Sequence, residues 1–228
     1  MLIMRVKAVT FDDFNTLRYS VGEREDIIYP ILEALIRQGL NFDNQEFLER
    51  YFRADKDYRR RLKETHRESL LDEIVSSILV ACSLKLGTIK RAVKEAVDQG
   101  LLTREYRWFP YTKRTLKTLR EKSYKLGLIS NTHWRIPEGL REEFERLFDV
   151  VTLSYEHGLA KPHPSIFVAT LSELRVDAGD CLHVGDDPIA DIRGAKDVGM
   201  KTAFIQRGRM KTDAGITIKR LDELEKYL

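Results

Sequence analysis

The chain has 228 residues, of which 43% are hydrophobic and 33% charged, and its formal net charge is +3. This is the composition of a globular protein with room for one sizeable domain, or for a core domain that carries a smaller inserted one. The apolar runs are far shorter than a bilayer span, which excludes a transmembrane helix, and the N-terminal run MLIMRVKAVTF lacks the features of a signal peptide. We therefore expect a cytoplasmic protein with no membrane partner.

The charged residues and the cysteines exclude two further classes. Basic residues form no tail or arm, so we expect no nucleic-acid partner. The two cysteines, Cys82 and Cys181, lie far apart in apolar runs with no second cysteine nearby for metal ligation. We interpret both as reduced core residues.

Short apolar, β-branched runs alternate with helical patterns along most of the chain. This alternation predicts an α/β fold with a doubly wound parallel sheet, in which the loops at the carboxyl ends of the strands carry the chemistry. The predicted strands are Val6–Phe11, Lys125–Ser130, Val150–Ser154, Cys181–Val184 and Lys201–Ile205, and the predicted helices are Thr112–Lys122, Pro137–Leu147, Pro164–Leu174 and Ile189–Val198.

One long segment breaks this alternation. From about Val21 to Tyr106 the apolar residues recur with helical spacing, and no convincing strand is present. An all-helical insertion after the first strand explains this pattern, and the aromatic-proline turn at Trp108–Tyr111 marks its end. The predicted domains are a core of residues 1–17 and 108–228 and an inserted helical domain of residues 18–107.

Four polar clusters stand where predicted strands end or shortly beyond them. In a parallel sheet those ends share one edge, so we expect the clusters to meet there. The clusters are Asp12-Asp13-Phe14-Asn15-Thr16-Leu17, Ser130-Asn131-Thr132, Lys161-Pro162-His163-Pro164, and Gly185-Asp186-Asp187 together with Asp191.

These clusters resemble the four motifs of the haloacid dehalogenase (HAD) superfamily, which are a nucleophilic aspartate followed four residues later by threonine, a serine or threonine, a lysine, and a final acidic pair. The stretches GLISNT, LAKPHPSIF and HVGDDPIADIRGAKDVGM are similar to the family pattern over many positions. The resemblance covers residues 1–17 and 108–228 and implies a hydrolase with a Rossmann-like core. The helical insertion resembles the type 1 cap of subfamily I in placement and length, though not by motif.

The resemblance implies a role for each residue of the clusters. Asp12 is the expected nucleophile, and Asp12, Asp186 and the backbone carbonyl of Phe14 are the expected ligands of Mg²⁺. Lys161 is expected to offset negative charge between Asp12 and the phosphate. The remaining expected roles are phosphate binding by Ser130 and the Asn131 backbone amide, support of the nucleophile loop by Thr16, and orientation of metal-bound water or of the loop by Asp187 and Asp191.

Phosphoryl transfer requires these residue types, because it needs an in-line nucleophile, neutralised phosphate oxygens and a bridging metal ion. A carboxylate can form an aspartyl-phosphate, and Mg²⁺ prefers carboxylate oxygens. Each residue also has an ordinary structural alternative. Asp12 and the Asp186-Asp187 pair could stabilise turns, Ser130-Asn131 could cap a helix, and Lys161 could be an exposed loop residue. The clusters as a set favour catalysis.

One position departs from the family pattern. Most phosphatases of the superfamily have an acid two residues after the nucleophile, where this chain has Phe14. Asp13 is one residue off and should project to the other side. The loss of general acid-base help would slow simple ester hydrolysis, typically by about 10²–10⁴-fold. His133 is another possible proton donor.

Three functions remain open at this point. The preferred prediction is a magnesium-dependent phosphatase that hydrolyses a small phosphorylated metabolite through an aspartyl-phosphate on Asp12, slowly or only with labile esters. The alternatives are a metal-independent 2-haloacid dehalogenase, since an apolar residue at position 14 resembles those enzymes, and a catalytically weak binding protein. Residues near the hinges, namely Arg18, Tyr19, Ser20, Trp108 and Tyr111, could line the pocket. The expected oligomeric state is a monomer or a homodimer.

Overall fold

The computed structural model describes residues 5–21, 28–40, 43–65, 86–98, 105–132, 136, 138–209 and 212–228. The chain divides into two compact units. The first unit comprises Met1–Tyr19 and Arg107–Leu228, and the second comprises Ser20–Tyr106. His133 and Cys82, for which the sequence suggested roles, lie outside the described residues.

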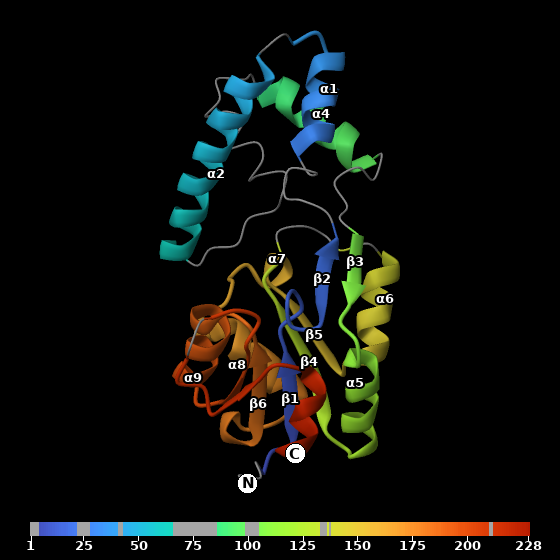
Figure 1. The fold of residues 1–228 in the computed structure, drawn as a ribbon, viewed down its shortest axis with the longest axis vertical. Helices are drawn as coiled ribbons and strands as arrows, with labels where there is room; N and C mark the ends of the chain where they lie inside the picture. Colours follow the sequence, from blue (N-terminus) through green and yellow to red (C-terminus); the bar gives the residue numbers. More distant parts are fainter. Residues whose placement is uncertain are drawn as a thin grey trace. The chain divides into compact units, whose positions relative to one another are not determined.

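A six-stranded sheet forms the centre of the first unit, and all its strand pairs are parallel (Figure 1). The strand order is β5-β4-β1-β6-β7-β8, so β1 lies in the interior of the sheet between β4 and β6. This confirms the predicted α/β fold. The strands are β1 (Ala8–Phe11), β4 (Lys125–Ser130), β5 (Val150–Leu153), β6 (Cys181–Gly185), β7 (Lys201–Ile205) and β8 (Ile216–Ile218).

Helices cover both faces of this sheet, as Figure 1 shows. On one face α5 (Thr112–Glu121), α6 (Glu138–Leu147) and the 3₁₀ helix η4 (Leu221–Lys226) contribute buried leucines and Phe144 to an apolar cluster. On the other face α8 (Pro164–Leu174) and α9 (Gly194–Asp197) form a second cluster around Phe167. Burial of both faces explains why the strands read as continuous apolar runs.

The second unit contains the described helices α1 (Ile28–Arg37), α2 (Asn44–Thr65) and α4 (Leu86–Asp98). Helices α1 and α4 pack against each other, and α1 buries Ile31 and Leu35 while α4 buries Ile89 and Ala92. The three- and four-residue spacing of these apolar positions is the helical periodicity that the sequence shows.

The structure adds strands that the sequence analysis did not predict. β2 (Arg18–Val21) and β3 (Glu105–Trp108) pair in a separate two-stranded sheet. Val21 of β2, and Glu105 and Tyr106 of β3, fall inside the segment from about Val21 to Tyr106 that was predicted to contain no strand. That expectation is therefore wrong at both ends of the segment. β8 is the other addition, and at three residues it is too short for periodicity to identify.

One predicted helix also has a different form. The sequence predicts one helix over Ile189–Val198, whereas the structure has the π-helix η3 (Pro188–Arg193) followed by the short helix α9. Here the Ile192 backbone N–H bonds the Asp187 carbonyl, and the wider turn places Asp191 in the interior. The helix η2 (Ala178–Asp180) and α7 (Ser154–His157) complete the core unit.

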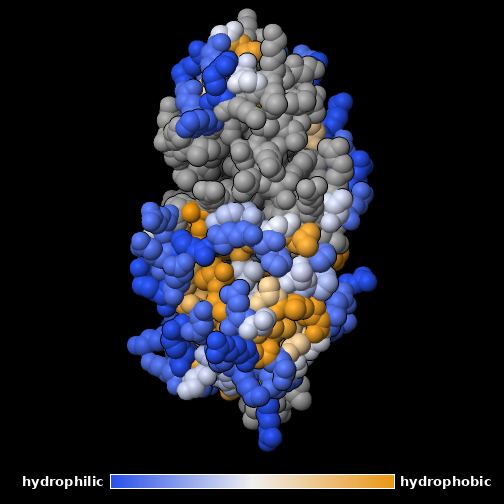
Figure 2. Space-filling model, turned by 180° about the vertical axis from the view of Figure 1, so that it is seen from behind, coloured by the Kyte–Doolittle hydropathy of each residue, from blue (hydrophilic) through white to orange (hydrophobic). Residues whose placement is uncertain are grey.

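No helix among the described residues is long and apolar enough to cross a membrane. Figure 2 shows hydrophilic side chains interspersed with apolar patches on one face of the described core, as the high charged fraction leads one to expect.

Candidate active site

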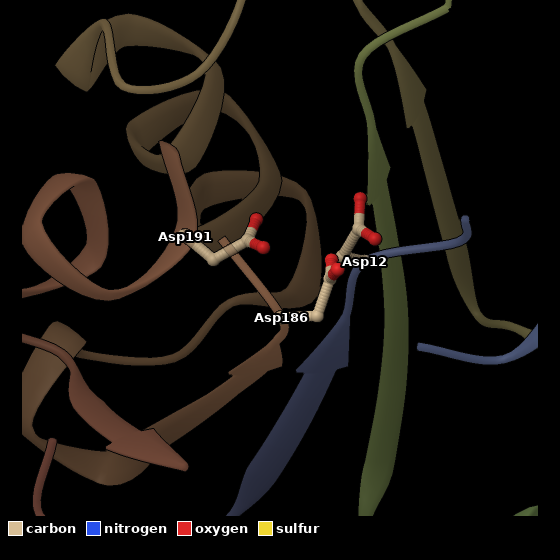
Figure 3. A group of neighbouring side chains, drawn as sticks. All are labelled: Asp12, Asp186 and Asp191. Atoms are coloured by element: carbon tan, nitrogen blue, oxygen red, sulfur yellow. The ribbon is translucent and has the colours of Figure 1, made fainter. Parts of the chain in front are cut away.

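Three neighbouring strands deliver polar residues to one edge of the sheet. Asp12 directly follows β1, Ser130 is the last residue of β4, and Asp186 directly follows β6. Lys161 comes from the segment between α7 and α8, and Asp191 lies in η3. Figure 3 shows the three aspartate side chains, which come from separate elements and lie close together. Lys161 contacts Asp12, Asp191 and Asn131, so the structure brings members of all four predicted clusters together.

Lys161 connects two of these aspartates. Its side chain is buried, and its Nζ donates to Asp12 Oδ1, to Asp191 Oδ1 and to the Ile129 carbonyl, each at 2.7 Å. An ammonium group has three donors, so these bonds saturate it. The two carboxylates raise the pKa of Lys161 against the lowering effect of its burial, so the side chain is a fixed cation.

The Asn131 side chain holds the Lys161 backbone. Asn131 Nδ2 donates to the Lys161 carbonyl at 2.9 Å, and the Lys161 N–H donates to Asn131 Oδ1 at 2.8 Å. The sequence analysis expected only the Asn131 backbone amide to act, on the phosphate. Asn131 therefore also positions the lysine, a role that depends on a tertiary contact between residues far apart in the chain.

Asp191 has partners on every side. Besides Lys161, its Oδ1 lies 3.3 Å from His183 Nε2, and its Oδ2 accepts from the Asp187 N–H at 2.9 Å. Burial alone would raise the pKa of Asp191, but Lys161 and His183 hold it well below the usual range. A Cβ on Gly185 would meet the Asp191 carboxyl carbon at 2.3 Å, so only glycine allows this close approach.

His183 is a buried residue that the sequence analysis missed. Its Nδ1 lies 2.9 Å from Thr10 Oγ1, and its ring packs edge-on against Phe167 at 5.3 Å between centroids. Burial lowers the pKa of His183, which favours a neutral ring that donates through Nε2 to Asp191 and accepts at Nδ1 from Thr10. A polar residue in the otherwise apolar run of β6 was the available signal.

The negative charges of Asp12 and Asp186 are less well stabilised by their neighbours than that of Asp191. Burial raises the pKa of Asp12 well above its usual value, and Asp191 and Asp186 raise it further against the effect of Lys161. Burial, followed by Asp191, raises the pKa of Asp186 to about 6. The surroundings thus favour the ionised form of Asp191 and disfavour the ionised forms of Asp12 and Asp186.

A divalent cation fits this arrangement. One ligand atom from each of Asp12, Asp186 and Asp191 lies within 4.8 Å of the other two. Because both Asp191 oxygens already accept hydrogen bonds, Asp12 and Asp186 are the carboxylates best able to bind an ion. Carboxylate oxygens are the ligands that Mg²⁺ prefers.

The nucleophile loop turns sharply after Asp12. Asn15 has a φ of 61°, and the N–H groups of Leu17 and Arg18 both bond the Asp13 carbonyl. The Asn15 side chain lowers the pKa of Asp186 against the larger effect of burial. Thr16 is fully buried, and its Oγ1 has no hydrogen-bond partner among the described residues, so its expected support of the loop is not a side-chain hydrogen bond there.

Phe14 and Asp13, the two residues after Asp12, differ in their exposure to solvent. Phe14 is 42% exposed, although it is a large apolar residue, whereas Asp13 is buried. Both Asp13 oxygens accept from the Arg18 guanidinium, at 2.8 and 2.5 Å. Asp13 is thereby committed to a buried ion pair, which agrees with the expectation that it does not replace the missing acid.

The remaining predicted residues have identifiable positions. Asp187 Oδ1 accepts from the N–H groups of Ile189 and Ala190 and so caps η3. Arg18, expected near the pocket, is buried and lies over the Trp108 and Phe144 rings. Tyr111 is 43% exposed and stacks with arginines of α5 and of the loop before η4.

Comparisons with known proteins agree with this geometry. The model of the haloacid dehalogenase-like hydrolase family matches residues 6–199. A Methanocaldococcus jannaschii protein named glyceraldehyde 3-phosphate phosphatase is 30% identical over 208 residues, which cover 90% of this chain and 87% of that protein.

Two solved structures are similar over nearly the whole chain. A 2-haloacid dehalogenase from Pseudomonas syringae pv. Tomato DC3000 has a TM-score of 0.71 and 23% identity, with 97% of each chain covered, and this likeness concerns the fold alone. A HAD phosphatase from Thermococcus onnurineus has a TM-score of 0.64 and 26% identity, with 96% of each chain covered. The match of the family model over most of the sequence, joined to this α/β fold, shows that the chain belongs to the haloacid dehalogenase-like hydrolase family.

Proposed function

We propose that the chain is a magnesium-dependent phosphatase that hydrolyses a small phosphorylated metabolite through an aspartyl-phosphate on Asp12. The observation that carries the proposal is the group of Asp12, Asp186 and Asp191, whose ligand atoms lie within 4.8 Å of one another beside the Lys161 cation. A buried and a partly exposed carboxylate, Asp12 and Asp186, that lie close together favour a divalent cation. The family membership and the relatives named phosphatases support the same reading.

In this proposal Asp12, Asp186 and the Phe14 carbonyl hold Mg²⁺. The ion would neutralise the phosphate and offset the repulsion between the two carboxylates. Asp191 would keep Lys161 in place, and Asp187 would hold the loop that carries Asp186. This division follows from the hydrogen bonds, because Asp191 and Asp187 already accept from the protein.

The chain's own groups would carry out two displacements. An Asp12 carboxylate oxygen attacks phosphorus and forms an acyl phosphate while the bond to the leaving oxygen breaks. Water then attacks the same phosphorus, which releases inorganic phosphate, restores the Asp12 carboxylate and gives a proton to solvent. Ser130 and the Asn131 N–H would bind the phosphate oxygens, Lys161 would offset negative charge between Asp12 and the phosphate, and Thr16 would support the loop.

Phe14 would determine which esters react fast. No acid stands at this position to protonate the leaving oxygen, so the rate should depend steeply on how stable the leaving group is as an anion. General acid catalysis typically contributes about 10²–10⁴-fold. We therefore propose slow hydrolysis of alkyl phosphates and faster hydrolysis of labile ones, such as acyl phosphates.

The relatives suggest the first metabolites to test. The M. jannaschii protein is named glyceraldehyde 3-phosphate phosphatase, so triose phosphates come first. We propose residues 18–107 as the cap that selects among substrates, and residues 1–17 and 108–228 as the catalytic domain. A cap of this kind excludes water and supplies specificity contacts.

The decisive experiment is a screen of triose phosphates, acyl phosphates, aryl phosphates and 2-haloacids, with Mg²⁺ and with EDTA. We expect magnesium-dependent phosphate release that Asp12→Asn abolishes. Metal-independent halide release would overturn the proposal in favour of a dehalogenase, which the apolar Phe14 favours. Magnesium binding with no turnover of any substrate would instead indicate a binding protein.

A pair of variants tests the role of Phe14. Phe14→Asp should raise the rate with alkyl phosphates about 10²-fold, because the new carboxyl group can protonate the leaving oxygen. Phe14→Asn is the matched control, since it has the same shape but no acidic proton. Equal gains in both variants would show that the size of Phe14, and not the missing acid, limits the rate.

A further inference from the structure

Arg207 binds the nucleophile loop, although neither a motif nor the proposed chemistry involves it. It lies shortly after β7, and its side chain donates only to backbone carbonyls in the bonds seen here. Nε reaches the Asn15 carbonyl at 2.8 Å, one terminal nitrogen reaches the Thr16 carbonyl at 3.2 Å, and the other reaches the Lys219 carbonyl at 3.3 Å. One side chain thus joins two loops.

The loop that Arg207 holds has a demanding backbone. Asn15 adopts a left-handed conformation with a φ of 61°, which few residues other than glycine and asparagine take. Arg207 binds the carbonyl of the same residue. The position of Arg207 therefore affects the turn after Asp12.

Arg207 also contacts an aromatic pair. Its guanidinium carbon lies 3.7 Å from the centroid of the Phe109 ring, and that ring lies 4.9 Å from the Tyr19 ring. The Phe109 N–H donates to the Leu17 carbonyl at 2.9 Å. Tyr19 and Phe109 lie at or close to the two points where the chain passes between the units, so the stack joins both to the nucleophile loop.

We propose that Arg207 is a positioning residue, which fixes the Asn15–Thr16 turn of the nucleophile loop and ties it, through Phe109 and Tyr19, to both chain crossings. Arginine suits this role because its planar group donates in several directions while its face stacks on a ring. A lysine has a compact point charge and lacks the planar group that donates in several directions while its face stacks on a ring. The effect on catalysis rests on the proposed function, whereas the effect on the loop does not.

The loop itself provides a test that needs no substrate. In Arg207→Met, which keeps an apolar stem, hydrogen exchange of the amides in residues 13–18 should become about tenfold faster, because the turn opens more often. Arg209→Met is the matched control, because Arg209 is an exposed arginine on the same loop, and it should exchange like the wild type. Unchanged exchange in Arg207→Met, or equal change in both variants, would overturn the proposal.

Kinetics separate positioning from mere stability. Arg207→Met should lower kcat about 10–100-fold with little change in KM, because a small misplacement of the nucleophile costs this much. Arg207→Lys should recover at most a small part of the loss. A wild-type kcat in Arg207→Met would contradict the proposal. If the wild-type chain itself turns over no substrate, the proposed function fails and the exchange measurement still decides the role of Arg207.

Discussion

The two sides of the active site differ in how their charge is balanced. On one side Asp191 accepts from Lys161, from His183 and from the Asp187 N–H, and its pKa lies well below the usual range because Lys161 and His183 outweigh its burial. On the other side Asp12 and Asp186 have raised pKa values because burial and neighbouring carboxylates outweigh Lys161. The same residue type therefore has opposite properties within one site.

This difference separates Asp191, which has a structural role, from Asp12 and Asp186, which we propose as ligands of a cation. Asp191 is an internal counter-ion, and its charge stabilises the position of Lys161. The ionised forms of Asp12 and Asp186 are disfavoured by their surroundings, so these two carboxylates would gain most from a bound cation. The predictions below test this division by removing a charge from each side.

The largest effect is expected for Lys161→Met. This change leaves the buried Asp12 and Asp191 without their shared cation, and removing one partner of a buried pair costs about 3–5 kcal/mol. Urea unfolding in EDTA measures the loss. Lys125→Met is the control, because Lys125 donates to a single carbonyl and should cost about 1 kcal/mol. Equal losses in the two variants would show that Lys161 does not balance the site.

Magnesium should stabilise the folded protein by binding to Asp12 and Asp186. A ligand at a hundred times its Kd stabilises the folded state by about 2.7 kcal/mol, so scanning calorimetry should show a higher Tm with Mg²⁺. Asp186→Asn should lose most of this gain. Asp187→Asn should keep it, because Asp187 caps η3 and asparagine caps well. A full gain in Asp186→Asn would place the ion elsewhere.

Much of this arrangement could be predicted from the sequence. The strands of a parallel sheet buried on both faces are apolar runs that end at polar residues, so the strand ends located Asp12, Ser130 and Asp186. The order of the clusters then placed them on one edge. The π-helical turn and β8 were missed, because the former depends on the inward position of Asp191 and the latter is only three residues long.

The contacts that hold the site were harder to predict. Asn131 binds the backbone of Lys161, and Arg207 binds the backbone of Asn15 and Thr16. A backbone acceptor is present at every residue, so the sequence contains no sign of which one a side chain will reach. Such positioning residues become visible only when the tertiary structure brings distant segments together.

A smaller effect of opposite sign is expected for Asp186→Asn without divalent cations. The folded-state pKa of about 6 exceeds the ordinary value of 3.8, so the ionised side chain destabilises the fold at neutral pH. The variant should gain about 1–2 kcal/mol there, less than the whole shift would give because Asp186 is partly exposed. This gain should shrink as the pH falls through about 6 and vanish below about 4, where the wild-type carboxyl group is protonated in both states. Urea unfolding across this range measures it, and a loss of stability at neutral pH would contradict the uneven balance.

The smallest effect is expected for a lysine–aspartate pair on the exposed surface of the same domain. Lys7 Nζ lies 2.6 Å from Asp180 Oδ2, a shorter distance than either Lys161 pair has, but the Lys7 side chain is 71% exposed. Water and salt screen such a pair, and holding two mobile side chains costs entropy. Lys7→Met should therefore leave the urea midpoint almost unchanged, and less changed still at high salt. If Lys7→Met cost as much as Lys161→Met, short distance rather than burial would decide the contribution of these pairs, and the distinction between balanced and unbalanced carboxylates would lose its physical basis.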